Sequence, residues 1–229
     1  MSVWGGEQTC GIGVATANSP QGPFTDHGKM FRSNEIGVQN SIDPSLLQYE
    51  GRNYLVWGSF RGIYVIELTT DGLSIMPGAK KKRIAGTAFE AVYIHKHGDY
   101  YYMFASIGSC CQGVKSTYKV VVGRSKKVWG PYKDKTGKPM LKNGYSLVIG
   151  ANDHFVGNGH GSQIIQDDAG QDWLLYHGFS RSTPENGRIL LLDQIKWNQE
   201  GWPYVREDLL LTKHKKHLYL ITDFQINQL

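Results

Sequence analysis

The stretch Ser41-Ile42-Asp43-Pro44-Ser45-Leu46-Leu47 opens a pattern that occurs three times in the chain. Eight residues after Asp43 a glycine begins the strand-like run 51–59, which is rich in aromatic and β-branched residues. Phe89-Glu90-Ala91-Val92-Tyr93-Ile94 leads into the run 98–106 with the same spacing of eight residues after Glu90. His160-Gly161-Ser162-Gln163-Ile164-Ile165 reaches the run 170–177 with two extra residues in the turn. The three copies predict three hairpins of one kind.

Repetition of short strands and glycine-bearing turns at long intervals is typical of a β-propeller. The start of the innermost strand of each blade lies beside the central axis, so equivalent positions converge there. Asp43, Glu90 and His160 hold that position in the three copies. Two carboxyl groups at a cleft are the minimum requirement for glycoside hydrolysis, one as acid and the other as base or nucleophile.

Each of the three residues also has a structural interpretation when it is taken alone. Asp43 precedes a proline, a common way to open a turn. His160 lies between two glycines and is typical of a loop histidine. Glu90 stands in an apolar stretch, where a surface glutamate is unexpected. Their shared position in the repeat favours a functional role.

Length and composition favour one all-β domain over residues 1–229. A chain of 229 residues can bury one sizeable core, and its 28 glycines and 13 tyrosines, between short apolar runs, indicate many strands and few helices. No stretch approaches the ~18 apolar residues of a membrane-spanning helix, so we expect no membrane partner. No secretion leader is visible at the N-terminus.

The positive charge does not indicate a nucleic-acid partner. The formal net charge of +5 gathers weakly in the segments 80–83 and 213–217, which we interpret as solvated turns or a tail. No phosphate-binding loop, zinc-finger spacing or recognition-helix pattern accompanies them.

The cysteine count excludes a disulfide framework. Three cysteines, Cys10, Cys110 and Cys111, leave at least one thiol free or paired elsewhere. The adjacent pair lacks metal-ligand spacing, and we expect two small buried residues in a loop.

The first residues have the pattern of the outer half of a blade. The alternating stretch 11–17 and the Ser-Pro-x-Gly-Pro turn that follows it are echoed by residues 120–125 and 128–132, where an inner half precedes them. We therefore expect three and a half blades, with a remnant over 1–39 and units beginning near 40, 87 and 155. Unclosed edges would favour a homodimer or a missing piece that covers them.

Four segments resemble motifs of glycoside hydrolase family 43, and specifically its endo-1,5-α-L-arabinanases. The most specific is 108–125, which begins Gly108-Ser109-Cys110-Cys111-Gln112-Gly113. The stretches 40–45, 89–91 and 157–162 match further family motifs, and residues 2–6 resemble the end of the inner hairpin of the second blade. The resemblance covers nearly the whole chain.

The resemblance implies a five-bladed propeller that lacks its first blade and the inner part of its second, and an inverting mechanism on α-1,5-L-arabinan. It implies that Glu90 is the general acid and that Asp43 is the carboxylate that keeps the pKa of Glu90 high. It implies that His160 supports a calcium ion near the axis, with water completing the shell. The general base of the family is an aspartate upstream of these residues, so we expect impaired activity. The intact protein would be extracellular or periplasmic.

Candidate substrate contacts follow from residue type and from these motifs. For stacking on sugar rings we expect Trp4, Trp57, Phe60 and Tyr118, although a tryptophan in a blade is more often core. For hydroxyl contacts we expect Asn40, Ser41, Ser109 and Ser162.

Two alternatives to an endo-arabinanase stay open. One is an exo-acting α-L-arabinofuranosidase or β-xylosidase of the same family. The other is a non-catalytic carbohydrate-binding propeller, against which the retention of Glu90 and Asp43 argues.

Overall fold

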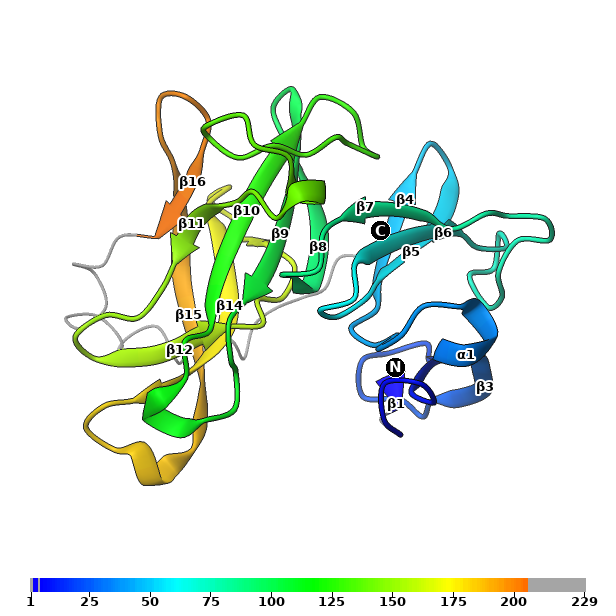
Figure 1. Cartoon of the computed structure of the whole chain (residues 1–229), viewed down its shortest axis with the longest axis horizontal. Helices are drawn as coiled ribbons and strands as arrows, with labels where there is room; N and C mark the ends of the chain where they lie inside the picture. The colour runs from blue at the N-terminus through cyan, green and yellow to red at the C-terminus, as the bar shows by residue number, and fades with distance from the viewer. Residues whose placement is uncertain (1, 4, 206–229) are drawn as a thin grey trace.

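The computed structural model describes residues 2–3 and 5–205 and consists mainly of β-strands, as predicted (Figure 1). The first sheet joins three antiparallel strands, β1 (Ser2–Val3), β2 (Gly11–Thr16) and β3 (Thr25–Arg32). The short helix α1 (Ser33–Ile36) follows β3 and ends at Gly37, which has a left-handed φ of 67°. This sheet occupies the residues that the sequence marks as a remnant of a blade.

The second sheet is a meander of four strands, β4 (Ser45–Tyr49), β5 (Arg52–Trp57), β6 (Ile63–Glu67) and β7 (Lys82–Ala85). A two-residue turn joins β4 to β5, with φ values of 49° at Glu50 and 72° at Gly51. Positive φ at both turn residues suits the right-handed twist of a hairpin. The glycine at the start of the repeated run is thus a turn residue.

The last two sheet units are continuous with one another. One contains β8 (Glu90–His97), β9 (Tyr100–Ile107), β10 (Lys119–Ser125) and β11 (Ser146–Ile149), with the 3-10 turns η1 (Gly113–Lys115) and η2 (Met140–Lys142) in its loops. The other contains β12 (Phe155–Gly159), β13 (Ile165–Gln166), β14 (Asp172–Ser180), β15 (Arg188–Trp197) and β16 (Pro203–Val205), with η3 (Pro184–Asn186) before β15. A parallel pair between Lys119 and Asn158 joins the two units into nine strands.

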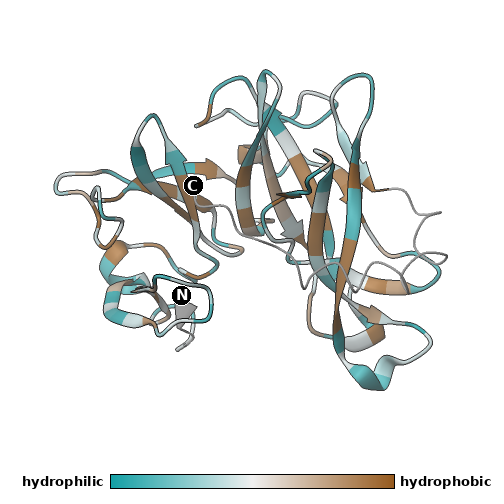
Figure 2. Ribbon diagram, turned by 180° about the vertical axis from the view of Figure 1, so that it is seen from behind, coloured by the Kyte–Doolittle hydropathy of each residue, from teal (hydrophilic) through white to brown (hydrophobic). Residues whose placement is uncertain are grey.

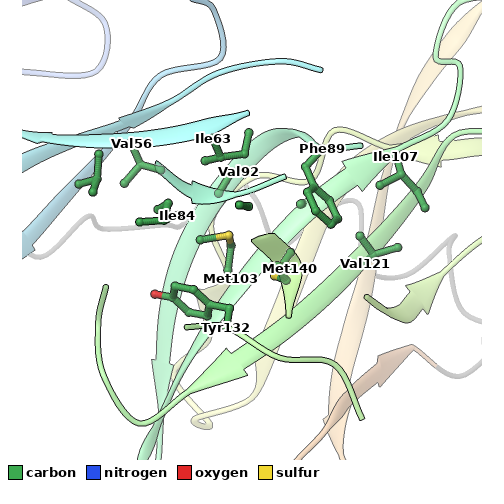
Figure 3. Close-up of a cluster of buried hydrophobic side chains, with 13 residues drawn as sticks. Val56, Ile63, Ile84, Phe89, Val92, Met103, Ile107, Val121, Tyr132 and Met140 are labelled. Atoms are coloured by element: carbon green, nitrogen blue, oxygen red, sulfur yellow. The ribbon is translucent and has the colours of Figure 1, made fainter. Parts of the chain in front are cut away.

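The core lies in three layers between successive sheets (Figure 2). Strand β9 contributes to two of these layers, because successive side chains of a strand point to opposite faces of its sheet. Met103 packs with Val56 and Val121 in the layer that faces the β4–β7 sheet (Figure 3). Tyr102 and Phe104 point the other way, into the layer shared with β14 and β15. A strand buried on both faces explains the continuous apolar run that follows Gly98.

Groups of strands begin near the predicted starts at 40, 87 and 155, namely β4–β7, β8–β11 and β12–β16, and the last two groups form one continuous sheet. Among the described residues the sheets do not close into a ring. The basic segment 80–83 is exposed, as expected, whereas the segment 213–217 lies outside the described residues. No helix in the described part of the chain has the length and hydrophobicity needed to cross a membrane.

Candidate active site

Asp43, Glu90 and His160 come from three different sheet units and meet in one place. The backbone N–H of Ala91, next to Glu90, donates a hydrogen bond of 3.2 Å to Asp43 Oδ2. The backbone N–H of His160 donates one of 2.8 Å to the hydroxyl of Ser106, which is the partner of Glu90 in the β8–β9 register. The charges of Asp43 and His160 both act on Glu90. The convergence expected from the repeat is therefore present.

The backbone at this meeting point is unusual. Asp43, Ala91 and His160 have φ values of 55°, 50° and 53°, the left-handed region that non-glycine residues rarely adopt. The three equivalent positions are thus Asp43, Ala91 and His160. Glu90 precedes its equivalent by one residue and opens β8. In the second copy of the repeat, the alignment made from the sequence is therefore wrong by one residue.

Glu90 is a buried carboxyl group with 8% of its surface exposed. Burial raises its pKa, and the negative charge of Asp43 adds to the rise. Hydrogen bonds from Tyr118 and Ser59 and the nearby His160 act in the opposite direction, but the pKa of Glu90 stays above its ordinary value. The Ser59 hydroxyl donates to Glu90 Oε2 at 2.8 Å. Glu90 is thus held in a fixed orientation and keeps its proton to higher pH than an exposed glutamate.

Asp43 has a raised pKa for a similar reason. Burial is the main cause, and it is opposed by the neighbouring His160 and by the hydrogen bond from the Ala91 N–H. Two adjacent carboxyl groups that both resist ionisation favour a state in which the pair retains a proton. Such a site can donate a proton to a bound ligand.

Three of the expected substrate contacts are interior residues instead. Trp57 is fully buried between Phe31 and Tyr64, with ring centroids 5.3 and 5.8 Å away. Ser41 is also fully buried; it accepts a hydrogen bond from the Trp57 indole and donates one to a backbone carbonyl. Asn40, 6% exposed, donates to a backbone carbonyl at 2.9 Å. These side chains support the site from within and present little or no surface to a sugar.

Asn40 is nevertheless linked to Glu90, the candidate acid, through Ser59. Its amide donates to the carbonyl of Ser59, and the hydroxyl of Ser59 donates to Glu90. Asn40 therefore positions Ser59, which in turn positions the carboxyl group.

The other expected contacts differ in exposure. Tyr118 is 1% exposed, and its hydroxyl lies beside Glu90 and 3.5 Å from His160 Nδ1, so it is a hydrogen-bonding residue of the site and presents no ring face for stacking. Phe60 is half-buried. Ser109 and Ser162 are also half-buried, and each hydroxyl has a local partner in its own loop. Trp4 lies outside the described residues.

Sequence reasoning missed Ser59, Ser106 and His177. Each of the two serines stands eight residues after a repeated glycine, Gly51 or Gly98, and this shared spacing was the available signal. The ring of His177 lies 5.8 Å from Tyr118 and 6.2 Å from His160 between centroids. Both its nitrogens are buried without a hydrogen-bond partner among the described residues, and burial lowers its pKa to about 4.

The adjacent cysteines form a disulfide with each other, contrary to the expectation of two buried thiols. Cys110 is half-buried and Cys111 is exposed, because the loop after β9 runs over the surface before it returns to β10. The Ser116 hydroxyl donates to the Cys110 carbonyl at 3.2 Å and fixes the loop. Cys10 is the buried free thiol that the odd count requires.

Comparison with known proteins shows the family of the chain. The model of glycosyl hydrolases family 43 matches residues 1–203. The chain belongs to this family. An extracellular exo-α-(1→5)-L-arabinofuranosidase of Cellvibrio japonicus is 38% identical over 225 residues, which covers 88% of this chain and 64% of the relative. An extracellular endo-α-(1→5)-L-arabinanase of Bacillus subtilis is 36% identical over 207 residues and is covered to 61%, against 86% of this chain.

Solved structures of family 43 share the fold. The α-L-arabinanase of Cellvibrio cellulosa in complex with arabinohexaose superposes with a TM-score of 0.82 at 34% identity, over 90% of this chain and 72% of that one. The native arabinanase of Bacillus subtilis gives a TM-score of 0.72 at 32% identity, over 87% of this chain and 68% of that one. The chain spans less than two thirds of the length of the two curated relatives.

Proposed function

We propose that this family 43 chain belongs to a glycoside hydrolase that cleaves α-1,5-L-arabinan with inversion, with Glu90 as general acid and Asp43 as the carboxylate that keeps its pKa high. The observation that carries the proposal is the pairing of buried Glu90, at the start of β8, with half-buried Asp43, just before β4; burial raises the pKa of both carboxyl groups. The names of the relatives, arabinanases and arabinofuranosidases, support the substrate class.

Cleavage of the glycosidic bond requires a group that donates a proton to the departing glycosidic oxygen near neutral pH. Glu90 meets this demand because its pKa lies above that of an exposed glutamate and because Ser59 fixes one of its oxygens. Asp43 stabilises the protonated form of Glu90 through its negative charge, and His160 limits that effect.

Inversion also requires a base that activates water on the opposite face of the sugar, with about 6.5–9.5 Å between the two carboxyl groups. We assign that role to no side chain among the described residues. Asp43 is the acid's near neighbour and has the role of tuning its pKa. Turnover by the chain alone is therefore the direct test of whether a base acts with Glu90.

The mode of cleavage has two candidates within the family. Similarity of the segment 108–125 to arabinanases favours endo action, whereas the relative of 38% identity is named as an exo-acting enzyme. Product length distinguishes them, because endo action releases a range of oligosaccharides and exo action releases one short product.

Incubation with linear 1,5-α-L-arabinan tests the proposal. Because no base is assigned, we expect slow release of arabino-oligosaccharides by the wild-type chain and none above background by the Glu90→Gln variant. The Glu185→Gln variant is a matched control, since Glu185 is an exposed glutamate on η3. Equal product release by wild type and Glu90→Gln would contradict the role of Glu90. Arabinan binding without product from any form would fit the lack of a base among the described residues as well as a non-catalytic binding propeller.

A calcium ion at His160 is part of this proposal. His160 and the Asp43 carboxylate lie close enough to interact electrostatically and offer one nitrogen and one carboxylate group. Calcium takes six to eight oxygen ligands, so water would supply most of the shell and we derive no catalytic step through the ion. Calcium titration of wild type and His160→Ala by calorimetry tests it, with binding expected for the wild type alone.

Location and assembly complete the proposal. The two curated relatives are named extracellular, which supports an extracellular or periplasmic location for the intact protein. Among the described residues the sheets do not close into a ring, and this open arrangement supports a homodimer that pairs exposed blade edges. Size-exclusion chromatography with light scattering tests the dimer, and a monomer at all concentrations would contradict it.

A further inference from the structure

Three metal-ligating side chains converge at the end of β8 that is farthest from Glu90. They are His95, His97 and Asp172, and their ligand atoms all lie within 4.8 Å of one another. His97 lies seven residues beyond Glu90 along β8, which corresponds to about 23 Å of extended strand. The group is thus separate from the candidate active site.

The register of two sheet units produces this convergence. His95 and His97 are two residues apart on β8, so their side chains share one face of the strand. That face packs toward the last sheet unit, where Asp172 opens β14. Asp172 is 7% exposed, a degree of burial that requires a partner for an ionised carboxylate.

Neighbouring side chains already hold the Asp172 carboxylate and the His97 imidazole in place. The indole N–H of Trp197 donates to Asp172 Oδ2 at 2.7 Å, and the Gln166 amide donates to Oδ1 at 3.3 Å. The His97 ring is stacked flat on Trp197, with centroids 3.7 Å apart and planes inclined by 7°. Partners of this kind hold ligands in place around a metal.

The spacing of the groups suits an ion pair as well as a shared metal ion. His97 Nδ1 and Asp172 Oδ2 are 3.8 Å apart, which is longer than a hydrogen bond. Ligands of a tetrahedral zinc ion, at about 2.0–2.1 Å from the metal, are separated from each other by roughly 3.4 Å. Small side-chain adjustments would therefore bring these atoms to coordination distance.

We propose that His95, His97 and Asp172 form a binding site for a divalent transition metal such as zinc, with water in the open position. Two imidazole nitrogens and one carboxylate oxygen suit zinc, copper or nickel and are a poor set for calcium or magnesium, which prefer oxygen. The bound ion links β8 to β14 and so ties neighbouring sheet units together. Zinc then stabilises the folded state.

Calorimetric titration of the EDTA-treated, dialysed full chain with zinc chloride tests the site directly. We expect one equivalent of zinc for this site, and its affinity should fall at least about tenfold in His97→Ala, because loss of even a supporting residue costs that much at a metal site. His95→Gln is a second variant, which keeps the side-chain volume close to that of the wild type. At zinc about 100-fold above Kd, the thermal midpoint of the wild type should rise by about 5–10 °C.

Two control variants test whether the zinc-binding signal comes from His95, His97 and Asp172. His154→Ala removes an exposed histidine of the β12 unit and should bind zinc like the wild type. His160→Ala separates this site from the candidate active site and should also keep the equivalent. His214 and His217 are the same in every variant. The proposal is overturned if zinc does not bind the wild type, or if His97→Ala and His95→Gln both bind it with unchanged affinity and stoichiometry.

Discussion

Replacement of Glu90 by glutamine should raise the unfolding free energy relative to the wild type, and this gain should be larger at pH 8 than at pH 4. Burial raises the pKa of Glu90, so its ionisation is more costly in the folded chain than in the unfolded one. The stability contributed by this group is fully present below its unfolded pKa of about 4.3 and is lost as the pH rises through the higher folded value. Glutamine does not ionise and avoids that loss.

The magnitude follows from linkage. The difference in unfolding free energy between Glu90→Gln and wild type should grow between pH 4 and pH 8 by about 1.4 kcal/mol for every pH unit that separates the folded and unfolded pKa values. Each kcal/mol corresponds to about 2–4 °C in thermal midpoint for a chain of this size. The Ser59 hydrogen bond to Oε2 can be kept by the glutamine carbonyl, so the shape of the site changes little.

Urea unfolding followed by tryptophan fluorescence at both pH values measures this difference. Glu185→Gln, on the exposed turn η3, controls for the loss of one carboxylate from the surface. A difference between Glu90→Gln and wild type that stays constant or shrinks from pH 4 to pH 8 would refute the claim that Glu90 is buried with a raised pKa.

Three further substitutions test the surroundings of Glu90. Asn40→Ala should lower the unfolding free energy by about 1–3 kcal/mol and reduce turnover more than substrate affinity, because it releases Ser59, which orients Glu90; unchanged kcat in steady-state kinetics would contradict this. Tyr118→Phe removes a hydrogen bond that lowers the pKa of Glu90, so the alkaline limb of the pH–rate profile should move to higher pH, and a move to lower pH would count against the assignment. Trp57→Ala should cost about 3–5 kcal/mol in urea unfolding because the side chain is core, and a loss of sugar binding without a loss of stability would show that it contacts substrate.

Much of the fold could be predicted from the repeat because its turn chemistry is local. The glycines at 51 and 98 stand at turns, and the runs after them form β5 and β9. The continuous apolar run of β9 follows from burial on both faces, a property of the stacked sheets. The parallel pair between Lys119 and Asn158 has no local signal, because it joins segments that are distant in sequence.

The convergence of the site could be predicted, but the exposure of its residues could not. Position in the repeat brings Asp43, His160 and the Glu90-Ala91 pair together, whereas the direction of each side chain depends on backbone angles such as the positive φ of Asp43. Trp57 is the clearest case, since nothing in the sequence distinguishes an inward indole from one at a sugar-binding surface. The disulfide between Cys110 and Cys111 depends on a loop geometry that the spacing alone does not reveal.

The role of Glu90 as a general acid is tested most directly by comparing two substrates in Glu90→Gln and wild type. Cleavage of arabinan needs protonation of a poor leaving group, whereas an aryl α-L-arabinofuranoside with an acidic phenol as leaving group needs little help from an acid. The account predicts that Glu90→Gln loses nearly all kcat/KM on arabinan and keeps most of it on the aryl substrate. Equal fractional loss on both substrates would contradict the assignment of Glu90 as the acid.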